Sequence, residues 1–434
     1  MLGSSGAIEE QPEAKFLEAH KHWKTESGRP SEIAAINEKA LRRFEMLGYP
    51  QSKHEMFTFV NVRSLGEINF VQPFWKSPEK AFLDSVVYEG CEKSHIALVD
   101  GVYSPELSNL SAVDNDLETS VLKKSDAEYL QKVLTEEDDP FSVLNGAFFS
   151  KGLSLNIKPK VVVSAPIQIT VISTGGEMPS SFPRILIRLG ELGELKVIVR
   201  YVGVGGSYFV NSELDAILGD GSGMTFTQIQ EDETNSLHFS RIRLRMGRNS
   251  RFHSVNASSG CRLARHHYSA RLEGEGAEFN LKGVNVLIGE EQAHYYVKVF
   301  HSAPSCVSNM HFKNIVNDKA RSSVDGTVIV EKDAQLTNSD QLINSLILSD
   351  NAHADSKPNL IISADDVKCT HGNTVGQIDE EQMFYLKTRG LHESVAKTLL
   401  TQSFAASIVK QADFPAVRKH LENILLKKLV ALRG

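Results

Sequence analysis

The sequence has few cysteines and no long apolar segment. Its four cysteines, at positions 91, 261, 306 and 369 of 434, are too sparse for a disulfide framework and favour a reducing compartment. No apolar run approaches the ~18–20 residues that a membrane-spanning helix needs. The opening residues, MLGSSGAIEEQPEAKF, match neither a signal peptide nor an Arg-rich transit peptide. We therefore expect a cytoplasmic chain without a membrane partner.

Motifs for nucleotide, zinc and hydrolase chemistry are also missing. GxxxxGK[ST] does not occur, so the chain itself holds no nucleotide in a P-loop. GVGGSY and GDGSGM are glycine-rich but open no helix, and we interpret them as tight turns. CxxC, HExxH and GxSxG are absent, which argues against a closed structural zinc site. The net charge of −7 argues against a nucleic-acid partner.

Three regions differ in pattern. Residues 1–150 are helix-rich, with one helix starting at Ser31 and ending near Gly48 and another over 125–136. Residues 151–367 alternate apolar and polar side chains in short runs such as PIQITVIS and LKVIVRYVG, which is typical of strands. Turn residues recur between these runs at roughly 27–32 positions. That loose period favours a β-solenoid, with a β-sandwich as the alternative.

Residues 368–434 are predicted to be helical. Asp379 can cap the first helix, Gly390 can end it, and Pro415 stands where a later helix can begin. An apolar stripe follows along that last helix, at Val417, Leu421, Ile424, Leu425 and Leu429. The stripe is explained equally by packing on a neighbouring helix and by a docking surface for a partner protein.

Cys369 and His371 are the strongest candidates for metal chemistry. If the segment is extended, both side chains leave the same face and Thr370 leaves the other. Two ligands are too few for tight zinc binding. They are enough for a transient iron or sulfur site that another subunit completes, since thiolate and imidazole both suit iron. On the residues alone, a buried inert thiol remains an equal alternative.

The other histidines are weaker candidates. His266 and His267 should point to opposite faces of one strand, and we expect one in the core and one at the surface. His294, His301 and Cys306 lie close in sequence, but their spacing fixes no geometry. The adjacent acids Asp365 and Asp366 give only weak support to a two-carboxylate glycosidase.

A longer segment around Cys369 resembles a known family. ADDVKCTHGNTVGQIDEEQMFYLKTRG is similar to the C-terminal signature of the SufD branch of the SufB/SufD family, scaffold proteins of the SUF iron–sulfur cluster assembly system. The blocks Asp139–Ile169 and Arg271–Leu287 are also similar to family segments. The SufB branch usually has a HEATTSK-like segment in place of this Cys-x-His, so SufD is the better match.

The resemblance implies a mainly β fold: a right-handed parallel β-helix over 151–367 between helical regions at 1–150 and 368–434. It implies a non-catalytic scaffold that pairs with a SufB-like paralogue through the β-helices. It also implies that the helices of 368–434 dock a SufC-like ABC ATPase, which agrees with the missing P-loop. It allows a homodimer when the paralogue is absent. No cofactor should be bound stably, although iron or a nascent cluster can be held transiently.

Specific residues follow from the same resemblance. Cys369 and His371 fall at positions that face the SufB interface, with His371 the stronger candidate for iron acquisition or cluster assembly. The positions expected to contact the ATPase are Asp379, Phe384, Tyr385, Arg389, Leu399 and Phe404. The run around His294 departs from the family pattern. Two alternative functions stay open: a β-solenoid polysaccharide lyase or hydrolase, and a SufB-like primary scaffold that itself holds the cluster.

Overall fold

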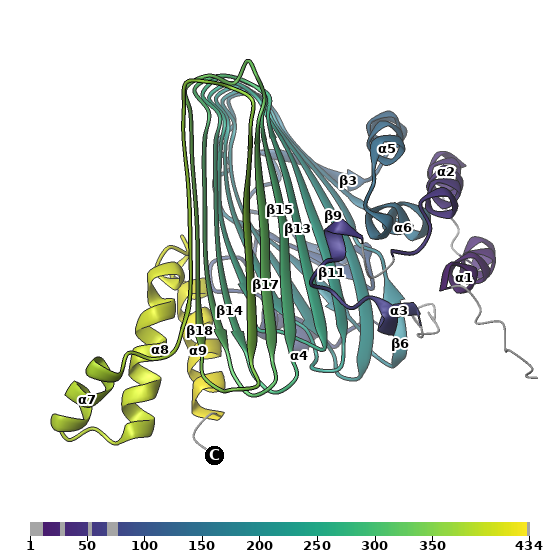
Figure 1. Cartoon of the computed structure of the whole chain (residues 1–434). Coiled ribbons are helices and arrows are strands. Elements are labelled where there is room, and N and C mark those ends of the chain that lie inside the picture. Colours follow the sequence, from purple (N-terminus) through teal and green to yellow (C-terminus); the bar gives the residue numbers. More distant parts are fainter. Residues whose placement is uncertain (1–11, 27–30, 51–53, 67–76, 432–434) are drawn as a thin grey trace, which may run out of the picture.

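The computed structural model describes residues 12–26, 31–50, 54–66 and 77–431 (Figure 1). Within these residues the helices are α1 (Pro12–Glu26), α2 (Ser31–Leu47), the 3-10 turn η1 (Glu55–Phe57), α3 (Arg63–Gly66), α4 (Lys80–Val86), α5 (Lys124–Glu136), α6 (Pro140–Phe148), α7 (Glu380–Thr388), α8 (Glu393–Val409) and α9 (Pro415–Ala431). The helices predicted from Ser31 and over 125–136 are confirmed as α2 and α5. Each helix of the described ranges is too short or too polar to span a bilayer.

The strands form two sheets that face each other. Sheet 1 contains, in spatial order, β2 (Val102–Asn109), β1 (His95–Val99), β5 (Ile167–Ser173), β8 (Glu194–Gly203), β10 (Gly223–Glu231), β12 (Arg251–Ser258), β14 (Glu278–Leu287), β16 (Val307–Val316), β18 (Thr337–Ile347) and β20 (Val367–Gly376). Sheet 2 contains β19 (His353–Ile362), β17 (Arg321–Val330), β15 (Gln292–His301), β13 (Leu263–Leu272), β11 (Leu237–Met246), β9 (Ser207–Leu218), β7 (Arg184–Leu189), β4 (Leu153–Ile157) and β3 (Leu117–Val121), and β6 (Glu177–Ser181) pairs with β9.

These sheets are the two walls of a parallel β-solenoid. From β7 onward the main-path strands alternate between the sheets along the chain, and each pairs in parallel with the strand one turn away, as β12 does with β10 and β14. A sandwich of hairpins is thereby excluded, and the prediction of a parallel β-helix is confirmed. The strand at the C-terminal end, β20, continues the solenoid to Gly376.

One corner of the solenoid repeats a left-handed turn residue. Positive φ angles recur about 27–31 residues apart, at Leu192, Gly221, Asn249, Gly276, Ser305 and Leu336. The N–H of each donates to a carbonyl of the next turn, as Ser305 does to Gln335 at 2.8 Å. This ladder explains the loose period of the sequence, because every coil must return through the same backbone geometry.

The interior is filled by alternate side chains of each strand. Phe252 and Phe279 are in register in successive coils, with ring centroids 5.7 Å apart. Phe226 lies two positions further along β10 than Met224, the register partner of Phe252, and its ring centroid is 5.8 Å from that of Phe252. Aromatic stacking between coils adds to the area that each ring buries. The opposite side chains of the same strands face outward and meet the helices.

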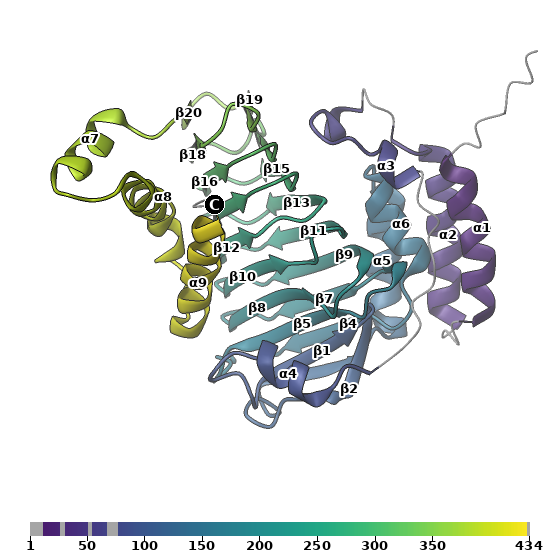
Figure 2. The same cartoon turned by 90° about the horizontal axis from the view of Figure 1, so that it is seen from below.

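Two groups of helices cover opposite sides of the solenoid (Figure 2). On sheet 2, α6 lies under α2 and α5, and Phe141 of α6 packs on Phe239 of β11 at 4.5 Å between ring centroids. On sheet 1, α8 and α9 bury an apolar face against β14 and β16.

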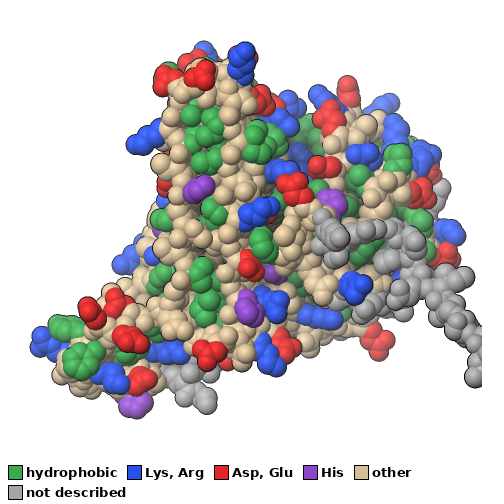
Figure 3. Space-filling view, in the orientation of Figure 1, with side chains coloured by type: hydrophobic (Ala, Val, Ile, Leu, Met, Phe, Trp, Pro, Cys, Tyr) green, Lys and Arg blue, Asp and Glu red, His purple; other side chains and the backbone are tan. Residues whose placement is uncertain are grey.

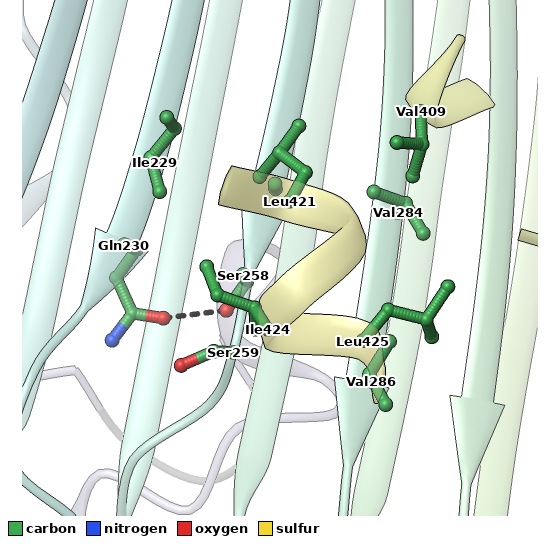
Figure 4. Close-up of a pocket in the computed structure, with 11 residues that line it drawn as sticks. Ile229, Gln230, Ser258, Ser259, Val284, Val286, Val409, Leu421, Ile424 and Leu425 are labelled. Atoms are coloured by element: carbon green, nitrogen blue, oxygen red, sulfur yellow. Dashed lines mark hydrogen bonds between the residues drawn. The ribbon is translucent and has the colours of Figure 1, made fainter. Parts of the chain in front are cut away.

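The predicted stripe of α9 is the face that packs on the solenoid. Val417, Leu421, Leu425 and Leu429 are buried, and Pro415 begins the helix as expected. Figure 4 shows Leu421 and Leu425 directed at the strands of sheet 1, around a cavity of only about 20 Å³. Lys428 Nζ lies 2.5 Å from Glu291 Oε2 and adds an ion pair at the end of the helix. This stripe is therefore covered within the chain.

Candidate functional site

Cys369 and His371 lie on β20, the strand that ends sheet 1. Cys369 is in register with Ser339 and His371 with Gln341, and both partners are buried inward-facing positions of β18. The expectation that the two side chains share one face is confirmed. Thr370 bonds the carboxylate of Asp340 on the other face. A thiol and an imidazole therefore line one face of an edge strand.

The two side chains differ in exposure. Cys369 is half-buried and packs against the solenoid interior, and His371 is exposed. Burial raises the pKa of the Cys369 thiol, and the backbone of Ser339 works in the opposite direction. Because the thiolate is the metal ligand, binding a metal here must also release a proton.

A buried polar chain leads away from this face into the solenoid. Ser339 Oγ lies 2.9 Å from Ser308 Oγ, which lies 2.8 Å from His301 Nε2. Next to His371, the Oε1 atom of Gln341 is buried and has no hydrogen-bond partner among the described residues. The solenoid interior beside Cys369 and His371 is therefore lined by polar side chains.

The described ranges contain no group of three or more His, Cys, Asp or Glu residues placed to hold a metal ion. His294 and His301 do not converge, because they lie on opposite faces of β15. His294 points outward to Ser323, with Nδ1 to Oγ 2.8 Å, whereas His301 points inward. Cys306 is buried at a corner, where its Sγ donates to Gly274 O at 3.3 Å.

The expectation of one surface histidine at 266–267 is wrong. The two imidazoles do leave opposite faces of β13, but both are buried. His266 is inside the solenoid, with Nδ1 2.9 Å from Ser240 Oγ. His267 faces outward and lies under the N-terminal helices, with Nδ1 2.8 Å from Asp139 Oδ2. The period of the strand did not reveal this cover, because it comes from a segment 128 residues away.

Most of the residues expected to meet an ATPase lie on α7 and α8. Asp379 caps α7 by accepting hydrogen bonds from the N–H groups of Glu381 and Gln382. Phe384 is 69% exposed and Tyr385 is 56% exposed.

Arg389 and Leu399 are exposed as well, and the Arg389 guanidinium lies 5.1 Å from the Tyr385 ring centroid. Phe404 differs from these residues because it faces the solenoid, where Lys313 Nζ lies 4.6 Å from its ring centroid. The described α7–α8 surface therefore presents two large aromatic side chains that are more than half exposed.

Sequence reasoning missed a buried ion-pair cluster between the N-terminal helices and sheet 2. Glu137 pairs with both Arg241 and Arg243, and Asp139 lies 2.8 Å from Arg265 Nη1. The arginines hold the pKa of both carboxyls well below the usual range despite their burial. The alternating arginines of FSRIRLRMG carried the relevant signal, because they place three cations on one face of a strand.

Comparison with known proteins identifies a family and several relatives. The family described as "SUF system FeS cluster assembly, SufBD core domain" matches residues 171–404, and "SufBD protein N-terminal region" matches 8–169. An iron–sulfur cluster assembly SufBD family protein of Synechocystis is 26% identical, covering 94% of each chain. SufD of Escherichia coli is also 26% identical, over 85% of this chain and 87% of its own. A chloroplastic protein of Arabidopsis thaliana, ABCI7, is 26% identical over 86% of this chain and 82% of its own. The chain belongs to the SufBD family of iron–sulfur cluster assembly proteins.

Proposed function

We propose that the chain is a SufD-like, non-catalytic scaffold subunit that offers Cys369 and His371 to iron or a nascent iron–sulfur cluster. The observation that carries this proposal is their position on one face of an edge strand. The cluster is cargo in this proposal and not a resident cofactor. Thiolate and imidazole suit iron, and two donors hold it only until further ligands arrive.

A second chain is the proposed source of those ligands. β19 and β20 end their sheets, so the described chain leaves a row of backbone groups unpaired at each edge. Ile361, Ile362 and Val375 are large apolar side chains exposed on these strands. Such an edge suits strand addition by a related β-solenoid, namely a SufB-like paralogue or, without it, a second copy of this chain.

An ABC-type ATPase is the proposed partner of the α7–α8 surface. Phe384 and Tyr385 are exposed aromatic side chains of the type that anchors protein interfaces. The sequence has no P-loop, so nucleotide hydrolysis in this proposal belongs to the partner. Membership of a SUF assembly family supports partners of the SufB and SufC types. A cytoplasmic location remains part of the same proposal.

Co-purification from the native host tests the partners. We expect an ATPase and a β-solenoid paralogue to appear by mass with the full chain. The Phe384→Ser/Tyr385→Ser variant should lose the ATPase and keep the paralogue. Met46→Ser, at an exposed apolar residue of α2, is the matched control and should lose neither. Recovery of the full chain as a monomer, without either partner, would refute the proposed assembly.

Cluster output tests the two donors. His371→Ala should leave folding and both partners intact, because the side chain is exposed, and should lower maturation of iron–sulfur enzymes. Normal maturation in this variant would remove His371 from the proposal. Anaerobic reconstitution of the isolated chain distinguishes the SufB-like alternative: a stable chromophore would favour a primary scaffold, and we expect none.

A further inference from the structure

A cleft of about 410 Å³ lies on the outer face of sheet 2. One wall is α5 with the segment that follows it, and the other is formed by the outward side chains of β11, β13 and β15. In Figure 1 this is the region between the solenoid and α5, and Figure 3 shows both Lys and Arg and Asp and Glu side chains there. The volume is in the range of small-molecule sites, roughly 300–1,000 Å³.

Positive charge predominates in this cleft. Its lining has six cationic residues, Lys132, Arg241, Arg243, Arg245, Arg271 and Lys298, and four acidic ones, Glu136, Glu137, Asp138 and Glu273. Two of the acids are already paired, Glu137 with Arg241 and Arg243, and Glu273 with Arg245. The parallel register stacks the cations in neighbouring coils, since Arg245 lies opposite Arg271.

Three of these cations have no carboxylate within ion-pair distance among the described residues: Lys132, Arg271 and Lys298. Two of them rest on aromatic rings. The Arg271 guanidinium lies 4.1 Å from the Phe300 ring centroid, and Lys298 Nζ lies 5.4 Å from that of Tyr296. The rings hold the two long side chains in place. The Lys298 ammonium also shares a hydrogen bond with the Tyr296 hydroxyl, and its remaining donors and the Arg271 guanidinium are available to a ligand.

Arg241 Nε and Tyr129 Oη are among the buried polar atoms of the lining that have no hydrogen-bond partner in the described part of the chain. Arg241 is only 8% exposed, so its guanidinium is largely removed from bulk water. A buried donor without an acceptor costs free energy, and a ligand rich in acceptor oxygens would satisfy it.

We propose that this cleft binds a small organic anion with at least two acidic groups, phosphate or carboxylate. Lys132, Arg271 and Lys298 contribute the free charges, and Arg241 and Tyr129 contribute donors deeper in the wall. Guanidinium and ammonium groups recognise both kinds of anion. The site stands apart from Cys369 and His371, which belong to sheet 1, and does not depend on the function proposed for them.

Calorimetric titration of the full chain at low ionic strength tests the proposal, with inorganic pyrophosphate and citrate as probes. We expect at least one probe to bind with a Kd of about 1 mM or tighter. Pyrophosphate alone would indicate a phosphate ligand, citrate alone a carboxylate ligand, and binding of both a site for either. Absence of binding by both probes would overturn the proposal.

Variants locate the site. Arg271→Gln/Lys298→Gln should weaken binding at least about tenfold, because two of the free charges are lost. Lys132→Gln changes the opposite wall at an exposed position of α5 and should weaken binding without a folding defect. Lys158→Gln/Lys319→Gln removes the same charge from exposed lysines elsewhere and should change the affinity less than twofold. Equal affinity in all these proteins would assign the anion to another surface and refute the cleft.

Discussion

The carboxylate of Asp139 lies 2.8 Å from the guanidinium of Arg265, and both side chains are buried. Asp139 is also the N-cap of α6, where it accepts a hydrogen bond from Phe141 N–H at 3.0 Å. One residue therefore begins the helix and fixes it to β13. This pair joins the N-terminal helices to the solenoid.

Replacing Asp139 should destabilise the protein strongly. Asp139→Asn can keep the helix cap but leaves Arg265 as an unpaired buried charge, which typically costs about 3–5 kcal/mol of unfolding free energy. Asp139→Ala should cost about 1 kcal/mol more, because the cap is lost as well. Urea unfolding monitored by circular dichroism measures both values.

Glu118→Gln is the control for Asp139→Asn. It removes one carboxylate from an exposed pair with Lys158, whose side chains are 59% and 68% exposed. Exposed pairs contribute at most about 1 kcal/mol. Similar losses in the two variants would show that the buried pair is not what holds α6 on the solenoid.

Cys369 should react with thiol reagents faster than the other three cysteines. Cys91, Cys261 and Cys306 are buried, whereas Cys369 is half-buried on an edge strand. Burial raises the pKa of all four thiols, to about 11 for Cys91. We therefore expect an aromatic disulfide reagent to modify one thiol of the native chain first, at least about tenfold faster than the others.

Cys369→Ser should abolish this fast phase, and Cys306→Ser should preserve it. A fast phase that persists in Cys369→Ser would place the accessible thiol elsewhere. If a SufB-like paralogue covers β20, its addition should slow the modification of Cys369. This last measurement also tests the proposed pairing edge.

The strands and the face of Cys369 and His371 were accessible to sequence reasoning because both depend on local periodicity. An extended strand puts residues two apart on one face, whatever packs around it. The α9 stripe was equally clear, since its apolar positions recur at helical spacing.

Local periodicity could not predict that the N-terminal helices bury His267, and it could not predict the cationic cleft. Each forms between segments more than a hundred residues apart, such as Glu137 and Arg243. Local patterns show which face of a strand a side chain occupies, but not which distant helix covers that face. The resemblance to a family supplied the order of the domains and none of these contacts.

Substitutions at the left-handed corner positions of the solenoid should change the stability in opposite directions, depending on whether glycine is introduced or removed. Leu336 has a φ of 59° and is 59% exposed, so its left-handed backbone is strained without much burial in return. Leu336→Gly should stabilise the protein by up to about 1 kcal/mol.

Gly221 occupies the corresponding corner position of an earlier coil with a φ of 67°, and an added Cβ would come within 2.6 Å of Leu192 Cδ2. Gly221→Ala should therefore destabilise by about 1–2 kcal/mol. Effects of the same sign in urea unfolding would contradict this account of the ladder.

Buried histidines should make the protein sensitive to mild acid. Burial lowers the pKa of His301 to about 4 and that of His294 to about 3. Between these values and about 6.5, the unfolded chain binds protons that the folded chain does not, so stability falls as the pH falls. Each such histidine contributes a little over 1 kcal/mol per pH unit within its window.

His301→Gln tests this contribution with the hydrogen bond to Ser308 still possible. Its unfolding free energy should change less between pH 6.5 and pH 4.5 than that of the parent protein, by roughly 1–3 kcal/mol over the interval. Glu213 works in the opposite direction, because burial raises its pKa to about 7, but its effect cancels when the two proteins are compared. An identical pH dependence in both proteins would mean that His301 is not buried as a neutral imidazole. Because His301 Nε2 bonds Ser308, which bonds Ser339, that result would also contradict the buried polar chain that leads to Cys369.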